Sequence, residues 1–122
     1  MEAVGDRPLR VVVVDNDPEV LSLLVTDLAL EGHDIVATAA HGDEAVELCR
    51  TLQPDVVVID FRMPPGINGV EAAAIIRREC PGVRVLLYTN YVNAEVARGA
   101  RRAGAVLIEK GNLRALRRAL AG

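Results

Sequence analysis

The stretch VVVVDNDP, residues 11–18, places four consecutive valines directly before a polar cluster. A continuous β-branched run bounded by polar residues is typical of a strand that is buried on both faces of a sheet. The polar residues Asp15, Asn16 and Asp17 would then lie at the edge where this strand ends. Carboxylates at such an edge can hold a cation or take part in chemistry. Their function depends on which other side chains reach the same edge.

The length and composition indicate a small globular protein. The chain has 122 residues, of which 51% are hydrophobic and 25% charged, so we expect residues 1–122 to form one domain, with residues 1–8 as an N-terminal tail. No apolar run approaches the roughly 18 residues of a membrane helix. The N-terminal stretch MEAVGDRPLR has neither a basic head nor an apolar core, so it does not resemble a secretory signal. We expect a cytoplasmic protein with no membrane contact.

Charge, aromatic content and cysteine spacing argue against nucleic-acid binding and against a cysteine metal site. A net charge of −3 and an aromatic content of 2% argue against direct nucleic-acid binding. Cys49 and Cys80 lie in or beside helical patterns without metal-ligand spacing, so we expect free, reduced thiols. Thirteen of the basic residues are arginine and one, Lys110, is lysine. The position of that single lysine is therefore informative.

Strand and helix patterns alternate along the whole chain. The apolar, β-branched runs are residues 9–14, 33–38, 55–60, 83–89 and 105–109. Helical periods lie between them, and Asp17 before Pro18 is suited to capping the first helix. The third helix is expected to follow Asn68-Gly69, the fourth to begin near Asn93 and the fifth to follow Gly111-Asn112. Five such alternations predict an α/β fold with a parallel sheet covered by helices on both faces.

Polar side chains follow four of the predicted strands. They are Asp15 and Asn16 after the first strand, Asp60 after the third, Thr89 after the fourth and Lys110 after the fifth. Ligands of open parallel sheets bind beyond the carboxyl ends of the strands. Two carboxylates and an amide suit Mg²⁺, which prefers oxygen ligands. A hydroxyl and an ammonium group suit a phosphoryl oxygen.

Four motifs in order carry a resemblance to a known family. VVVVDNDP, VVVIDFRMP, VLLYT and GAVLIEK together resemble the receiver domain of bacterial two-component response regulators. The resemblance implies a flavodoxin-like (βα)5 fold with strand order 2-1-3-4-5. It also implies a phosphorylation-dependent signalling switch that accepts a phosphoryl group from a histidine kinase. Such a domain is not an enzyme in the usual sense, although it catalyses its own phosphotransfer and dephosphorylation.

The resemblance assigns roles to individual residues. Asp60 would be the phosphoacceptor, and Thr89 and Lys110 would contact the phosphoryl group. Mg²⁺ would be held by Asp15, Asn16, Asp60 and the backbone carbonyl of Arg62. The predicted chemistry is metal-assisted in-line phosphoryl transfer.

The sequence departs from the family pattern at several positions. Asn16 replaces a second acid, which lowers the formal charge of the site from about −3 to about −2. Asn90 replaces a small residue, Leu107 replaces an aromatic residue that moves with Thr89, and Gly111 replaces a proline. Tyr88 and Tyr91 are candidates to replace the missing aromatic residue.

Two alternative functions stay open at this point. The departures favour a phosphorylation-independent pseudo-receiver that serves as a protein-binding module. The D-N-D stretch also resembles the motif of haloacid-dehalogenase-like phosphatases, with Asp15 as nucleophile and Asp17 as acid. The retained Asp60, Thr89 and Lys110 speak against the first alternative. The absence of a later acidic pair speaks against the second.

The last two predicted helices are rich in arginine and form what we call the arginine face. Its residues are Arg98, Arg101, Arg102, Arg114, Arg117 and Arg118. Because acids are scarce there, a symmetric dimer through this face would bring like charges together. We expect the face to meet an acidic partner or an output domain, either separate or C-terminal.

Overall fold

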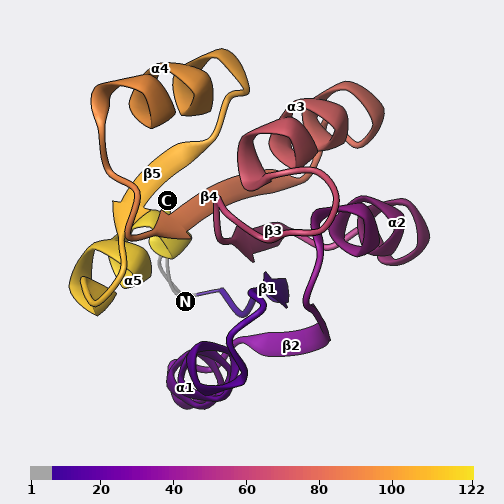
Figure 1. Cartoon of the computed structure of the whole chain (residues 1–122). Coiled ribbons are helices and arrows are strands. Elements are labelled where there is room, and N and C mark those ends of the chain that lie inside the picture. Colours follow the sequence, from indigo (N-terminus) through magenta and orange to yellow (C-terminus); the bar gives the residue numbers. More distant parts are fainter. Residues whose placement is uncertain (1–6) are drawn as a thin grey trace.

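The computed structural model describes residues 7–122, and these form a sheet flanked on both sides by helices (Figure 1). Of the predicted N-terminal tail, residues 1–6 lie outside the described part, while Arg7 and Pro8 are exposed and precede the first strand. The elements are β1 (Arg10–Val14), α1 (Pro18–Leu30), β2 (Asp34–Ala39), α2 (Gly42–Leu52), β3 (Val56–Ile59), α3 (Gly69–Glu79), β4 (Arg84–Thr89), α4 (Ala94–Arg102), β5 (Val106–Glu109) and α5 (Leu113–Ala121).

The sheet has the predicted topology. Its order is β2-β1-β3-β4-β5, and every neighbouring pair is parallel. Each observed strand begins within one residue of the expected run, so the predicted fold is confirmed. The chain moves from β1 to one edge through β2 and then to the other side through β3. The strand order therefore reverses between β1 and β3, which is where such sheets bind ligands.

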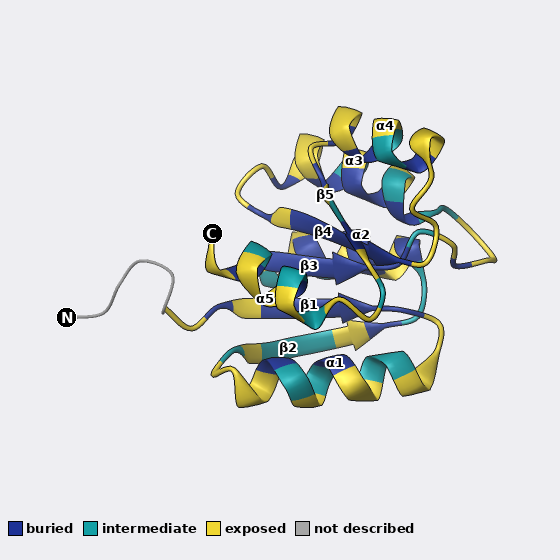
Figure 2. Cartoon of the chain, turned by 90° about the vertical axis from the view of Figure 1, so that its left-hand side faces the viewer, coloured by how far each residue is buried: buried dark blue, intermediate teal, exposed yellow. Residues whose placement is uncertain are grey.

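Two cores lie on the two faces of the sheet, and β1 contributes to both. Val11 and Val13 pack in the core under α1 and α5, whereas Val12 and Val14 pack in the core under α2, α3 and α4. All four valines are at most 1% exposed. Successive strand side chains point to opposite faces, so a strand covered on both sides needs apolar residues at every position. Figure 2 shows the buried central strands between partly exposed helices.

The predicted helix starts are confirmed by side-chain caps. Asp17 Oδ1 accepts from Glu19 N at 2.9 Å, and Asn112 Oδ1 accepts from Ala115 N at 3.0 Å. Asn93 caps α4 in the same way. Asn68 forms a capping box with Glu71, in which each side chain bonds the other's backbone N–H. These caps fix the start of each helix close to the strand end before it.

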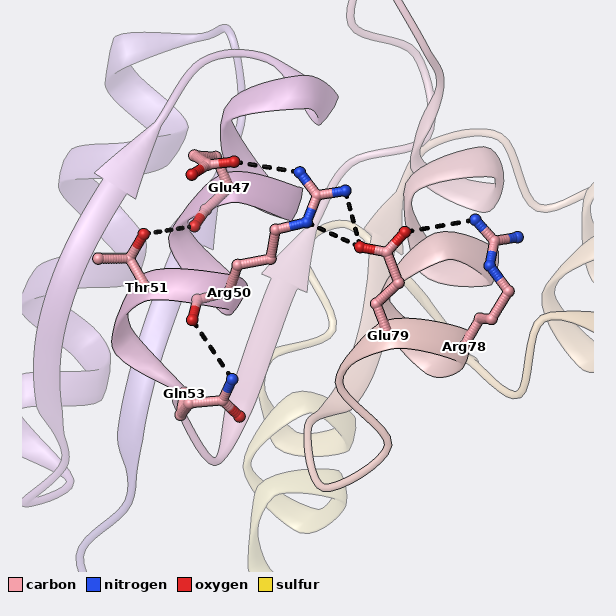
Figure 3. Close-up of polar contacts among 6 residues, drawn as sticks. All are labelled: Glu47, Arg50, Thr51, Gln53, Arg78 and Glu79. Atoms are coloured by element: carbon pink, nitrogen blue, oxygen red, sulfur yellow. Dashed lines mark hydrogen bonds and ion pairs between the residues drawn. The ribbon is translucent and has the colours of Figure 1, made fainter.

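An ion-pair network on the surface joins α2 to α3 (Figure 3). Arg50 contacts Glu79 at 2.7 Å and Glu47 at 3.1 Å. Arg78 approaches the other carboxylate oxygen of Glu79 at 3.4 Å. The network joins the last turns of the two helices and contributes to their packing. Among residues 7–122, no helix is long and apolar enough to span a membrane.

Candidate functional site

Two carboxylates lie side by side where β1 and β3 end. Asp15 and Asp60 directly follow these paired strands, and their backbone N–H groups extend the ladder by donating to Ala39 O and Val14 O. Asp15 is 1% exposed and Asp60 is 6% exposed. Buried carboxylates require charged or hydrogen-bonding partners. The sequence-based expectation that both acids lie at one edge of the sheet is confirmed.

Lys110 supplies the opposite charge for both acids. Its Nζ lies 2.8 Å from Asp15 Oδ2 and 2.9 Å from Asp60 Oδ2, and its side chain is 16% exposed. The lysine follows β5, and its backbone N–H donates to Thr89 O at 3.0 Å. Three side chains from the ends of three strands therefore converge on one point. The structure brings together Asp15, Asp60 and Lys110 as the sequence predicted.

Burial and ion pairing shift the pKa values of Asp15 and Lys110. Burial raises the pKa of Asp15 above its ordinary value, although the hydrogen bond from Lys110 opposes this effect. Burial lowers the pKa of Lys110, but its bonds to the two aspartates outweigh that effect and leave the pKa raised. Lys110 therefore stays a cation at neutral pH. A cation held against two buried carboxylates is the electrostatic centre of this edge.

The loop after β1 holds Asp15 and leaves Asp17 outside the site. Asp15 Oδ1 accepts from Asp17 N at 2.9 Å. The side chain of Asp17 is exposed and caps α1, as its bond from Glu19 N shows. The structure thus gives Asp17 a structural role and does not aim it at a reacting group. This geometry does not support the phosphatase alternative, which required Asp17 as the acid.

The loop after β3 fixes the orientation of Asp60. Asp60 Oδ1 accepts from Phe61 N at 2.7 Å, and Phe61 O in turn accepts from Gly69 N at 2.7 Å. A Cβ on Gly69 would lie 2.1 Å from Asp60 O, so only glycine lets α3 begin this close to the strand end. Sequence reasoning placed Gly69 at a helix start but missed this contact. A glycine at the start of a helix gives no signal, in the sequence alone, of such an approach.

Thr89 is buried at the end of β4 and forms no hydrogen bond with either carboxylate. It is 0% exposed, and its Oγ1 accepts from Tyr91 N at 3.2 Å. The ring of Tyr91 packs against that of Phe61 at an interplanar angle of 55°, with 5.9 Å between the ring centroids. Asn90, between Thr89 and Tyr91, is exposed. Thr89 is therefore at the predicted strand end, and its contact with a phosphoryl group stays a prediction.

The predicted metal ligands fit Mg²⁺ in part. Asp15 Oδ2 is buried and lies 2.8 Å from Lys110 Nζ. Asn16 and Arg62 are exposed in the two loops that border the acids. Within residues 7–122, no three or more acidic, histidine or cysteine side chains are placed so that they could hold a metal ion together. The available set is two carboxylates, an amide and a carbonyl, which suits an ion that keeps several waters and does not form a closed protein cage.

The positions that depart from the family pattern have distinct surroundings. Leu107 is half-buried against the core under α2, α3 and α4. Gly111 has φ +94°, a conformation that proline cannot adopt, so the loop after Lys110 differs from one with proline at this position. Tyr88 is 2% exposed, and its hydroxyl accepts from Gly111 N at 2.9 Å. Tyr88 is thus a core residue, whereas Tyr91 lies at the surface next to Thr89.

The family model of the response regulator receiver domain matches residues 11–120. The chain belongs to this family. The match covers all ten elements of the sheet and its helices, and it assigns the D-N-D stretch to a receiver domain and not to a phosphatase. Receiver domains act in two-component signalling, so the fold and the class of the protein are both established.

Known receiver domains resemble the chain in sequence and structure. The transcriptional regulatory protein LnrK of Bacillus subtilis strain 168 is 36% identical over 98 residues, covering 80% of this chain and 44% of LnrK. The signal receiver domain of the response regulator NarL from Mycobacterium tuberculosis has a TM-score of 0.86 and 31% identity, covering 95% and 98% of the two chains. TrrA from Thermotoga maritima, solved with Mg²⁺ and BeF, has a TM-score of 0.80 and 31% identity over 91% of this chain and 95% of TrrA.

The chain spans less than half the length of the curated relatives that it matches. What those relatives do as whole proteins is therefore not transferred to this receiver domain. The matched region is the part that they share with it, namely the sheet and the edge that carries Asp15, Asp60 and Lys110.

The predicted arginine face of this receiver domain is smaller than expected. Arg117 turns toward α1, where it forms ion pairs with Asp27 and, at 3.9 Å, with Glu31. Arg117 was expected to belong to the arginine face, but these ion pairs direct it to α1. This pairing could not be predicted from local patterns because α1 and α5 are distant in sequence and become neighbours by packing on the same face of the sheet. The other five arginines of the set are exposed and form no ion pair within residues 7–122.

Proposed function

We propose that the protein is a phosphorylation-dependent signalling switch in which Asp60 accepts a phosphoryl group from a histidine kinase. The observation that carries the proposal is the single lysine of the chain lying between Asp15 and Asp60, 2.8 and 2.9 Å from their Oδ2 atoms. A scaffold that only binds partners has no need for two buried carboxylates and a lysine at the ligand-binding edge. Phosphoryl transfer needs a carboxylate nucleophile and a cation for the phosphoryl oxygens.

Each group has a separate task in the transfer. A carboxylate oxygen of Asp60 attacks the phosphorus atom, a P–O bond to Asp60 forms, and the bond to the donor histidine nitrogen breaks. The donor leaves with the bonding electron pair. Lys110 neutralises charge on the transferred oxygens, and it already contacts Asp60 before transfer. Thr89, at the end of β4, has a hydroxyl hydrogen available for a phosphoryl oxygen, since Oγ1 acts as acceptor toward Tyr91 N.

Mg²⁺ is part of the proposal as the ion that offsets the charge of the phosphoryl group. Asp15, Asp60, the amide of Asn16 and the carbonyl of Arg62 would hold it, with water as the remaining ligands. The two buried carboxylates share one ammonium group, that of Lys110, which leaves a net negative charge that supports a further cation at this edge. TrrA, the similar receiver from Thermotoga maritima, was solved with Mg²⁺ and BeF, which also supports it.

The proposal includes the wider setting of the switch. We propose that residues 1–122 form one receiver domain, that it works in the cytoplasm, and that it passes its signal to an output domain on the same or another chain. The larger size of the relatives supports an output domain. The five exposed arginines on α4 and α5 that lack an internal ion pair favour an acidic partner surface. We do not propose catalysis beyond phosphorylation and dephosphorylation of Asp60 itself.

The first test is the intact mass of the protein after incubation with acetyl phosphate. The wild type should gain one phosphoryl group with Mg²⁺ and little without it. Asp60→Asn should gain none. Asp17→Asn is the matched control, because Asp17 is the neighbouring loop acid, and asparagine caps a helix as well as aspartate.

The outcome separates the proposal from the pseudo-receiver alternative. A gain that persists in Asp60→Asn would place the modification elsewhere. If the wild type gains nothing at high Mg²⁺, the proposal fails and a phosphorylation-independent binding module becomes the better explanation.

A further inference from the structure

Tyr88 belongs to the core but carries its polar atom to the functional edge. It is the penultimate residue of β4, pairs in register with Ile108 of β5, and packs in the core under α1 and α5. Its ring fills space as phenylalanine would. Its hydroxyl instead reaches past the end of β5 and accepts from Gly111 N at 2.9 Å. A buried tyrosine hydroxyl usually has a hydrogen-bond partner. The informative feature of this bond is therefore where the partner lies.

The position of this bond is next to Lys110. Gly111 directly follows the lysine and has φ +94°, which places it in a conformation that glycine adopts readily. A side-chain anchor at that residue restricts where the loop can go. A residue without an N–H at position 111 could not make this bond.

Two neighbouring residues of β4 therefore fix the backbone on both sides of the lysine. Thr89 O accepts from Lys110 N at 3.0 Å, and the hydroxyl of Tyr88 accepts from Gly111 N. The side chain of Lys110 leaves the backbone between these two bonds and ends between the carboxylates of Asp15 and Asp60. Lysine has a long and flexible side chain, so the position of its ammonium group depends on where the backbone starts it.

We infer that Tyr88 is a positioning residue for Lys110: its hydroxyl holds the loop after β5 so that the ammonium group reaches both carboxylates. The expected effect of Tyr88 on phosphorylation rests on the proposed function, in which Lys110 is the cation that neutralises the transferred phosphoryl oxygens. The geometric part of the inference, which concerns the place of the lysine side chain, stands independently of that function.

Tyr88→Phe tests the inference because it removes the hydroxyl and keeps the ring. The matched control is Tyr91→Phe, the same chemical change in the other tyrosine, which is exposed. Lys110 is the only lysine, so protein labelled with ¹³C at lysine Cε gives one side-chain signal from this residue. At a fixed neutral pH we expect that signal to move toward the value of an unfolded chain in Tyr88→Phe and to stay unchanged in Tyr91→Phe.

The rate of phosphorylation by acetyl phosphate is the second readout. Loss of one hydrogen bond should lower the rate by about three- to tenfold in Tyr88→Phe. Tyr91→Phe should keep the wild-type rate. If Tyr88→Phe lowers only the melting temperature and leaves the Lys110 signal and the rate at wild-type values, the tyrosine is merely structural and the inference is wrong.

The experiment distinguishes failure of this inference from failure of the proposed function. If the wild type accepts no phosphoryl group, the proposed function fails while the Lys110 signal still decides the role of Tyr88. If Tyr88→Phe does not fold, amide exchange of wild-type Gly111 decides instead. An amide that exchanges as fast as one in an unfolded chain would overturn the inference, and a protected amide would support it.

Discussion

Gly69 lies so close to Asp60 that a Cβ on the glycine would be 2.1 Å from the carbonyl oxygen of the aspartate. The same Cβ would be 2.7 Å from Leu87 Cδ1, so it would meet side chain as well as backbone. The contact arises because α3 starts against the end of β3, with Gly69 N donating to Phe61 O. The start of α3 and the position of Asp60, the proposed phosphoacceptor, therefore depend on each other.

Gly69→Ala should be destabilising for that reason. The added methyl group must displace backbone, which is the costly kind of overpacking, and we expect a loss of at least about 2 kcal/mol. Phosphorylation by acetyl phosphate should slow as well, because Asp60 O and its carboxylate move together. Urea denaturation measures the first effect. Gly82→Ala is the control, since nothing lies within 4 Å of a Cβ there. Equal stability of the two variants would contradict the close approach.

Glu79→Gln should reveal a pH-dependent contribution to stability from the α2–α3 network. The hydrogen bond from Arg50 holds the pKa of Glu79 below its usual value. A depressed folded-state pKa gives stability that is complete above the unfolded pKa and is lost as the pH falls through the folded pKa. Because both groups are solvent-accessible, the effect should be small and weakened by salt. Wild type and Glu79→Gln should thus differ in urea midpoint at pH 7 and converge in acid.

The Arg50→Gln background is the control for this effect. Without the guanidinium group, Glu79→Gln should change the urea midpoint little at any pH. A difference that persists in that background would mean that Glu79 acts through another contact, such as the one with Arg78.

The fold was predictable from the sequence because its determinants are local. The four valines of β1 are buried on both faces, and capping residues such as Asn68 mark where helices begin. The meeting of Asp15, Asp60 and Lys110 followed from one topological rule, that parallel strands end at a common edge.

The remaining features depend on distances that no local pattern encodes. Tyr88 reaches Gly111 across 23 positions of sequence, and its apolar neighbours in β4 gave no sign that its hydroxyl has a partner. Helix periodicity assigns Arg117 to a basic face, but it shows only which residues share a face and not which helix lies opposite. The ion pair of Arg117 with Asp27 on α1 could therefore not be predicted. The approach of Gly69 to Asp60 is likewise a matter of packing.

Cys49 should be chemically inert in the folded protein. Burial, followed by proximity to Cys80, raises the pKa of its thiol to about 12. At pH 8 the reactive thiolate would then be roughly one molecule in ten thousand. Iodoacetamide at that pH should leave Cys49 unmodified in native protein and modify it in urea, as peptide mass mapping can show. Alkylation of the native protein at the rate of a free thiol would contradict the burial of this residue.

Asn16→Asp should strengthen Mg²⁺ binding. Asn16 lies exposed directly after Asp15, and the substitution adds a carboxylate to a site that has two. Affinity for hard divalent cations increases with the number of charged oxygen ligands. We expect a gain of about tenfold, which corresponds to ~1.4 kcal/mol, measured by isothermal titration calorimetry. Phosphorylation should then require less Mg²⁺.

Asn90→Asp is the matched control for the added charge. Asn90 is exposed beside Thr89 at the same edge, so the change is chemically identical and differs only in position. General electrostatic attraction should improve Mg²⁺ binding in both variants, but direct coordination should do so in Asn16→Asp alone. If the two variants bind Mg²⁺ equally well, then residue 16 does not coordinate the ion, and Asp15 and Asp60 hold it without Asn16. A clearly larger gain for Asn16→Asp would identify the amide of the wild type as a weak ligand that sets the Mg²⁺ concentration at which the switch operates.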